Sequence, residues 1–173
     1  EQKERYRSGR ELRSMDAEKF TKKSLEVIES CEKLAYEYNN QELTQAHLMY
    51  ALVTVEDSLI AKLLTNMGIN MDAFTGECEK LVANRPKVSG GQLFTSPEFS
   101  KALIQAEKEA KQMGDDYISV EHIFLGLLEK ADKDIKRVIN AYGITRGKFL
   151  EVLANIRGNR KVESDNPEDT YDA

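Results

Sequence analysis

The sequence predicts an all-α fold made of two pseudo-symmetric four-helix repeats that form one compact domain. Residues 43–53 (LTQAHLMYALV) and 118–128 (ISVEHIFLGLL) are two versions of one segment, and each holds one of the chain's two histidines, His47 and His122. Apolar residues recur at helical spacing in both halves, and no run alternates as a half-buried strand does. A duplicated helical unit explains these observations together.

The duplication extends well beyond the histidine segments. At a constant offset of 75 residues, without a gap, identical residues pair along the chain: Ala35 with Ala110, Leu52 with Leu127, Asp57 with Asp132, Ile60 with Ile135, Gly68 with Gly143 and Phe74 with Phe149. Other positions keep apolar character, as Ile28 and Leu103 do. A repeat of this length is therefore the unit of the fold.

The signals for the first two helices of each repeat agree. Thr21 and Ser96 are the expected N-caps of the first helix, and Pro97 takes the first helical position, where a missing N–H costs nothing. Thr44 and Ser119 are the expected N-caps of the second helix. Each repeat thus begins with the same pair of helix starts.

The third and fourth helices also carry matched signals. Gly68 and Gly143 are expected to end the third helix in the left-handed conformation, which glycine adopts without a steric penalty. The expected N-caps are Asp57 and Asp132 for the third helix, and Asn70 and Thr145 for the fourth.

The two histidines lie three residues after an N-cap. An imidazole at that place can bond to backbone polar groups, as Glu does in a capping box, and this structural role is the favoured interpretation. A metal site is disfavoured because neither Cys31 nor Cys78 has metal-ligand spacing, and no nucleophile with an orienting acid accompanies the histidines. A glycine-rich phosphate loop is also missing, so we expect no enzyme activity, metal or cofactor in this chain.

Composition excludes several classes of function. The chain has 173 residues, of which 40% are hydrophobic, enough for one domain with a core. No apolar run approaches the roughly 20 residues of a membrane span, and the hydrophilic start is unlike a secretory signal. The net charge of −5 argues against a nucleic-acid partner. The two cysteines are expected to be free thiols in a reducing cytoplasm.

The chain divides by composition into five segments. Residues 1–14 are basic and are expected to be an upstream extension, natural or added, before Met15. Residues 15–82 form the first repeat, 83–95 a linker with Pro86 and a Gly-Gly pair, and 96–158 the second repeat. Residues 159–173 are polar and acidic, which is typical of a linker leaving the domain.

The motif order resembles that of a known family. The pair FT at residues 20–21, a helix, a polar turn and the segments LTQAHLMYALV and YISVEHIFLGLLE resemble the Clp N-terminal repeat, from about Phe20 to Gly158. That family places two such repeats ahead of AAA+ unfoldase motors. The resemblance implies that residues 159–173 lead toward an ATPase module, and that the parent protein uses ATP and Mg.

The type of motor is suggested by two details. The tail NPEDTYDA is similar to the segment that follows this domain in ClpB-type disaggregases. ClpC-type relatives carry Glu-His in both repeats, where the glutamates resemble a phospho-arginine recognition device. Here Glu121 precedes His122 but Ala46 precedes His47, which favours the ClpB type. A ClpC-type domain that binds adaptors and phospho-arginine substrates remains an alternative, as does a stand-alone accessory protein that docks on a protease or motor.

The ClpB-type resemblance implies a module that binds exposed apolar segments of unfolded or aggregated proteins for ATP-driven threading. The implied partners are the parent's ATPase ring, a homo-hexamer, and a DnaK-type chaperone system in the cytoplasm, with no nucleic acid and no membrane. Binding of many sequences requires an apolar groove with a polar rim. We expect that groove between the lobes, where both first helices meet the GGQLF segment at residues 90–94.

Seven residues are candidates for substrate binding. The resemblance implies a role for the polar residues Thr21, Asp115 and Glu121 and for the apolar Leu103. Helix capping, turn formation and a favourable charge at a helix N-terminus are structural alternatives for the three polar residues. We add Phe94, Ile104 and Tyr117, because apolar and aromatic side chains beside a polar turn suit promiscuous binding, although core packing is the alternative for each.

The family pattern is incomplete at two apolar positions. Gln105 and His122 stand where relatives have leucine. A polar side chain at these positions weakens the expectation that this part of the groove is used as in relatives.

Overall fold

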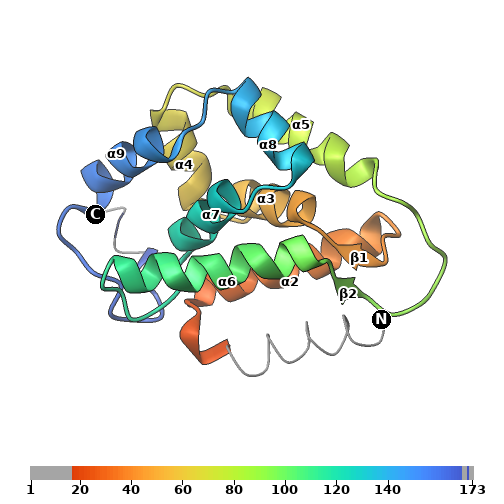
Figure 1. The fold of residues 1–173 in the computed structure, drawn as a ribbon, viewed down its shortest axis with the longest axis horizontal. Helices are drawn as coiled ribbons and strands as arrows, with labels where there is room; N and C mark the ends of the chain where they lie inside the picture. The colour runs from red at the N-terminus through yellow and green to blue at the C-terminus, as the bar shows by residue number, and fades with distance from the viewer. Residues whose placement is uncertain (1–16, 169–170, 172–173) are drawn as a thin grey trace.

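A computed structural model describes residues 17–168 and residue 171 (Figure 1). The predicted extension at residues 1–14 and Met15 lie outside the described residues. In chain order the elements are η1 (Ala17–Lys19), α2 (Lys22–Glu37), β1 (Glu42–Leu43), α3 (Gln45–Thr54), α4 (Leu59–Asn66), α5 (Met71–Ala83), β2 (Phe94–Thr95), α6 (Pro97–Gln112), α7 (Val120–Glu129), α8 (Lys133–Ala141) and α9 (Arg146–Arg157). The predicted all-α class is confirmed, since each strand has only two residues.

The helices form two sets of four that interlock. Helices α2 to α5 correspond to α6 to α9, and the contacts between the sets come in reciprocal pairs. Helix α4 packs on α9 as α8 packs on α5, and α4 packs on α7 as α8 packs on α3. Helices α3 and α7 pack on each other near the centre (Figure 1). Reciprocal contacts of this kind indicate an approximate two-fold axis.

Two short backbone pairings follow the same symmetry. Strand β1 pairs in parallel with β2, with Leu43 opposite Thr95, and an isolated parallel bridge joins Phe20 to Ile118. At the offset of 75 residues, Phe20 corresponds to Thr95 and Ile118 to Leu43. The residue before the N-cap of the first helix of one repeat thus pairs with the residue before the N-cap of the second helix of the other. The Phe20–Ile118 bridge brings the start of α2 beside the start of α7, and the β1–β2 pair brings the start of α6 beside the start of α3.

The core is centred on α3 and α7, which are buried along most of their length. Helix α7 comes very close to α6 at Gly126. A Cβ atom built there would lie 2.3 Å from the Ala102 carbonyl oxygen, closer than any real Cβ contact. Only glycine fits this crossing without a shift of backbone.

Most predicted helix boundaries are confirmed. The side chains of Thr21, Ser96, Asn70, Asp132 and Thr145 each accept a hydrogen bond from a first-turn amide of their helix. The predicted helix ends at glycine are also confirmed, with φ of 85° and 66° at the two matched positions.

The predicted cap at Asp57 is wrong. Ser58 is the N-cap of α4, and its Oγ accepts from the Ala61 amide at 3.0 Å. Asp57 instead has φ of 54°, a left-handed conformation that Asp tolerates better than most residues because its short side chain can bond locally. The turn before α4 therefore has one more residue than the turn before α8.

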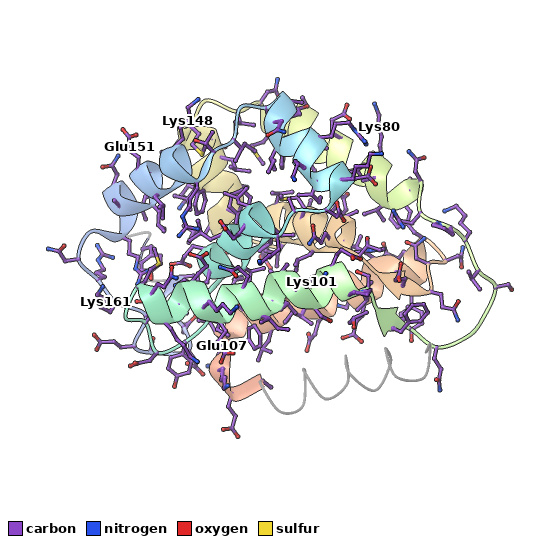
Figure 2. All side chains as sticks on the ribbon, in the orientation of Figure 1. Lys80, Lys101, Glu107, Lys148, Glu151 and Lys161 are labelled. Atoms are coloured by element: carbon purple, nitrogen blue, oxygen red, sulfur yellow. The ribbon has the colours of Figure 1, made fainter. Side chains whose placement is uncertain are left out.

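The segment after α9 does not simply lead away from the domain. Val162 and Tyr171 are buried, at 0% and 6% exposure, and Glu168 is buried as well. Figure 2 shows Lys161 beside the C-terminal end of α6, where its Nζ donates to the Met113 carbonyl at 2.7 Å. The composition predicted a linker leaving the domain; within it, Val162 bonds to Asp115 of the second repeat and Glu168 to Thr21 of the first.

Candidate functional site

Each histidine completes the capping box of a buried helix. The Thr44 amide donates to His47 Nδ1 at 3.0 Å, and the Ser119 amide donates to His122 Nδ1 at 2.9 Å. Because Nδ1 accepts from an amide, the ring proton lies on Nε2. Burial, and then the charge of Arg85, lower the pKa of His47 to about 4. The predicted structural role of both rings is confirmed.

The two rings donate their Nε2 proton to different partners. His47 Nε2 lies 2.9 Å from Asn40 Oδ1, and His122 Nε2 lies 2.7 Å from Asp115 Oδ2. Asn40 and Asp115 are themselves separated by 75 residues. The repeat offset thus identifies Asn40 as the neutral counterpart of Asp115, a match that the sequence prediction overlooked.

Asp115 is held in an ionic network in the second repeat. Its Oδ1 accepts from Arg157 Nη2 and from the Val162 amide, the latter at 3.0 Å. Arg157 is 5% exposed, and its Nε donates to the Arg160 carbonyl at 2.9 Å. Burial alone would raise the pKa of Asp115, but the hydrogen bonds from His122, Arg157 and the Val162 amide outweigh it and hold that pKa well below its usual range.

Two further carboxylates lie against this network. Glu121 is fully buried; its Oε2 lies 3.6 Å from Arg157 Nη1, and neither of its oxygens has a hydrogen bond among the described residues. Glu168 Oε2 accepts from Thr21 Oγ1 at 2.7 Å and from the Val120 amide at 3.3 Å. Burial, and then the nearby charge of Glu121, raise the pKa of Glu168 to about 7.

These side chains form one buried polar cluster, which also includes Tyr171; its members are Thr21, Asp115, Glu121, Arg157, Glu168 and Tyr171. The structure therefore brings together the three polar residues that were predicted as a site. Their exposed fractions are 0% for Thr21, 8% for Asp115 and 0% for Glu121. All three are covered in this conformation. Arg157 and Glu168 were missed because neither lies in a motif.

The four other predicted residues lie elsewhere. Leu103 is a core residue at 3% exposure, so it does not line an open groove, whereas the next residue, Ile104, is 51% exposed on α6. Tyr117 is half-buried beside Asp115. Phe94 precedes the N-terminus of α6, and Asp115 follows its C-terminus. A helix of 16 residues is about 24 Å long, so Phe94 lies far from the cluster at the other end of α6.

Phe94 lines an open pocket instead. This pocket, called the linker pocket below, has a volume of about 170 Å³ and is lined by Asn40, Gln41, Glu42, Arg85, Pro86, Val88 and Phe94. Val88 is 40% exposed and Phe94 half-buried, so apolar surface faces solvent there. Polar side chains surround that surface. Apolar surface with polar side chains around it thus lies beside the linker between the repeats.

Residues 17–168 and 171 offer no group of three His, Cys, Asp or Glu side chains arranged to hold a metal ion. Cys31 and Cys78 are free and buried, and burial raises the pKa of both thiols. Among the described helices, none has the length and apolar character required to cross a membrane.

Comparison with known proteins gives consistent matches. The Clp repeat (R) N-terminal domain family matches residues 19–142. A chaperone protein ClpB from Nitratidesulfovibrio vulgaris is 40% identical over 165 residues, which is 92% of this chain and 19% of the relative. A chaperone protein ClpB from Clostridium tetani is 39% identical, again over 92% of this chain and 19% of the relative. The chain thus spans about a fifth of the length of these relatives.

Solved structures agree with the fold. The N-terminal domain of Hsp104 from Candida albicans superposes with a TM-score of 0.76 at 20% sequence identity, covering 86% of this chain and 98% of that domain. At this identity the likeness shows the fold alone.

Proposed function

The chain belongs to the Clp repeat (R) N-terminal domain family, and on this premise we propose that it is the substrate-engaging N-terminal domain of a ClpB-type protein disaggregase. The observation that carries the proposal is its 40% identity, over 92% of its length, to a ClpB chaperone. The domain binds exposed apolar segments of unfolded or aggregated proteins. The rest of the parent, a homo-hexameric ATPase ring that uses ATP and Mg, threads them. A DnaK-type chaperone system is the proposed partner in the cytoplasm.

We assign the first contact with substrate to the linker pocket. Pro86, Val88 and Phe94 offer apolar surface to a side chain of an unfolded polypeptide. A single shallow pocket gives weak, sequence-tolerant binding, which suits a module that must release its substrate to a motor. Ile104, exposed on α6, is a second apolar contact point.

Binding of an unfolded model polypeptide, titrated by fluorescence anisotropy, tests this assignment. Val88→Asp places a charge in the linker pocket and is expected to weaken binding about tenfold, or about 1.4 kcal/mol. Ala73→Asp is the matched control, because it adds the same charge at an exposed position in the first turn of α5. Equal affinity of Val88→Asp and the control would exclude the pocket. Absence of binding by the native chain would contradict the proposed function itself.

A ClpC-type role is the second candidate, and Glu121 is the observation that favours it. A duplicated receptor for phospho-arginine requires a carboxylate in each repeat, and Ala46 cannot supply one. We therefore expect free phospho-arginine to compete poorly with the unfolded polypeptide. Two saturable phospho-arginine sites per chain would support the ClpC-type assignment. A stop codon shortly after the codon for Ala173 in the gene would instead support the stand-alone accessory protein.

A further inference from the structure

The segment after α9 caps the N-termini of two helices. The first amide of a helix has no partner within that helix. The first amide of α2, at Lys22, donates to the Asp165 carbonyl at 2.7 Å. The first amide of α7, at Val120, donates to Glu168 Oε2 at 3.3 Å. Both amides thus take their acceptors from residues more than 40 positions away in the chain.

The same segment is also held by backbone bonds and by apolar burial. The Val162 amide donates to Asp115 Oδ1 at 3.0 Å, and the Val162 carbonyl accepts from the Asp116 amide at 2.8 Å. The side chain of Val162 is fully buried, and Tyr171 is 6% exposed. Val162, Glu168 and Tyr171 therefore anchor the segment where the two repeats meet, while residues 163–166 between them are exposed.

The opposite end of the pseudo-symmetric domain does not require such a cover. There the counterpart of Lys22 is Pro97, the first residue of α6, which has no N–H that would need an acceptor. The counterparts of Glu121 and Arg157 at that end are Ala46 and Val82, neither of which is charged. The docked segment is thus matched to charges and amides at one end of the molecule, where the start of α2 from the first repeat meets α7 and α9 from the second.

The docked state is opposed as well as favoured. Glu168 lies near the like charge of Glu121, whose own cation, Arg157, is already paired with Asp115. Glu168 Oε1 and the Tyr171 hydroxyl have no hydrogen bond among the described residues, which costs free energy in a buried place. The helix caps favour docking, whereas the like charges and the unsatisfied polar atoms oppose it, so the segment docks less tightly than the caps alone would provide.

We propose that residues 162–168 and Tyr171 form an intramolecular latch, which covers Thr21, Asp115 and Glu121 when docked and opens them to substrate when released. This proposal rests on the proposed function, because it treats those three residues as a second contact with unfolded polypeptide. The linker pocket remains open in both states. Substrate first bound there meets the second contact only after the latch has detached.

Protonation of Glu168 makes the docking of the latch depend on pH. The titratable groups that act on Glu168 are Glu121 on α7 and Tyr171 in the latch itself. Beyond them in the same cluster lie His122 on α7, Asp115 before α7 and Arg157 on α9, and Lys22 on α2 pairs with Asp165 of the latch. Docking raises the pKa of Glu168 from 4.5 to about 7, so docking takes up a proton between these pH values. The docked state is therefore favoured at low pH and weakens as pH rises toward 7, by roughly tenfold per pH unit at most.

Amide hydrogen exchange on the full chain reports the latch directly. We expect the Lys22 and Val120 amides to be protected at pH 6 and less so at pH 8. Tyr171→Ala and Val162→Asp should abolish this protection without changing exchange in the core of α7. Glu168→Gln, which keeps an acceptor but cannot ionise, should maintain it at pH 8. The matched controls make the same kind of change at exposed positions: Tyr36→Ala for Tyr171→Ala, Asn159→Asp for Val162→Asp, and Glu163→Gln for Glu168→Gln.

Titration of the same variants with an unfolded model polypeptide tests the covering role. If the latch is closed in about nine molecules of ten, opening it strengthens apparent binding about tenfold. Tyr171→Ala and Val162→Asp should therefore bind more tightly than their controls, and Glu168→Gln more weakly at pH 8. Two opened variants are used because, if one of them fails to fold, the other still tests whether opening the latch strengthens binding.

The possible failures can be told apart. Rapid exchange at Lys22 and Val120 in the native chain at both pH values would show that the segment does not dock, and would overturn the latch alone. Lost protection with unchanged polypeptide affinity would show a docked segment that covers no binding site. If the native chain, whose linker pocket is open in both states of the latch, does not bind the polypeptide, the proposed function fails, whatever the exchange data show.

Discussion

Replacement of Asp115 by Asn isolates the energetic role of the buried network. Asn can still accept the His122 proton, as Asn40 does from His47 in the first repeat. The charge of Arg157, which is 5% exposed, would then face only Glu121, at 3.6 Å. Removing one partner of a buried ion pair costs about 3–5 kcal/mol. Because Glu121 retains part of the pairing, we expect a loss of about 3 kcal/mol in the free energy of unfolding.

The first repeat provides the compensating change. Its residues at the two positions are Asn40 and Val82, which is fully buried. Arg157→Val in the Asp115→Asn background removes the stranded charge but leaves the buried Glu121 without its cation, so we expect only about 1 kcal/mol of the loss to be recovered. Arg157→Val alone leaves both Asp115 and Glu121 without that cation and should be more harmful than Asp115→Asn. The coupling between the two positions is therefore favourable and large.

Urea unfolding at pH 7, followed by far-UV circular dichroism, measures all four members of this double-mutant cycle. The pH dependence gives a second check. Because the pKa of Asp115 is lowered on folding, its contribution is complete above about pH 4 and is lost as pH falls further. Asp115→Asn should lack this part of the acid sensitivity. A loss below about 1 kcal/mol for Asp115→Asn, or additive losses in the double variant, would refute the reasoning.

Three further predictions concern backbone and caps. Gly126→Ala should cost about 1–3 kcal/mol in thermal or urea unfolding, because the new Cβ meets the Ala102 carbonyl; its control, Gly76→Ala in α5, has open space and should be neutral or stabilising. Gly143→Val, at φ of 66°, should cost about 1–2 kcal/mol, and an unchanged melting temperature would contradict the assigned helix end. His47→Gln should lower stability by about 1 kcal/mol, while calorimetric titration with zinc shows no tight site that depends on the histidine.

Local chemistry was sufficient to predict the helices. N-caps and glycine stops act within one turn, so Thr21, Ser96 and Gly68 could be assigned from their immediate neighbours. The failure at Asp57 has the same origin. Asp and Ser are both good caps and both tolerate turns, so two adjacent candidates in the sequence Glu-Asp-Ser could not be ordered without the turn geometry.

The candidate site was predictable only in part, because it depends on contacts between distant segments. Leu103 was assigned to a groove by resemblance, yet its place on the buried face of α6 follows from packing against α7. The burial of Val162 and Tyr171 could not be predicted either. Their spacing shows no period, and the partners of their segment are the Lys22 amide on α2, the Val120 amide on α7 and Asp115 between α6 and α7, which are far apart in the sequence. Composition alone therefore indicated a linker leaving the domain.

Comparison of the two repeats separates the residues that specify the fold from those that form the site. Positions with matching chemistry in both copies, such as the His47 and His122 capping boxes, support helices that both copies require. Four positions that differ in charge or in hydrogen-bonding groups are Asn40 and Asp115, Ala46 and Glu121, Val82 and Arg157, and Pro97 and Lys22. At one end of the molecule, Asp115, Glu121 and Arg157 of the second repeat and Lys22 of the first lie in or beside one buried cluster, and the segment after α9 docks on it. A fold that needs this cluster for stability alone would need it at both ends, yet the end that carries Asn40, Ala46, Val82 and Pro97 packs without it. The charges of the cluster are therefore best explained by a role that one end of the molecule performs, which is what the latch variants measure.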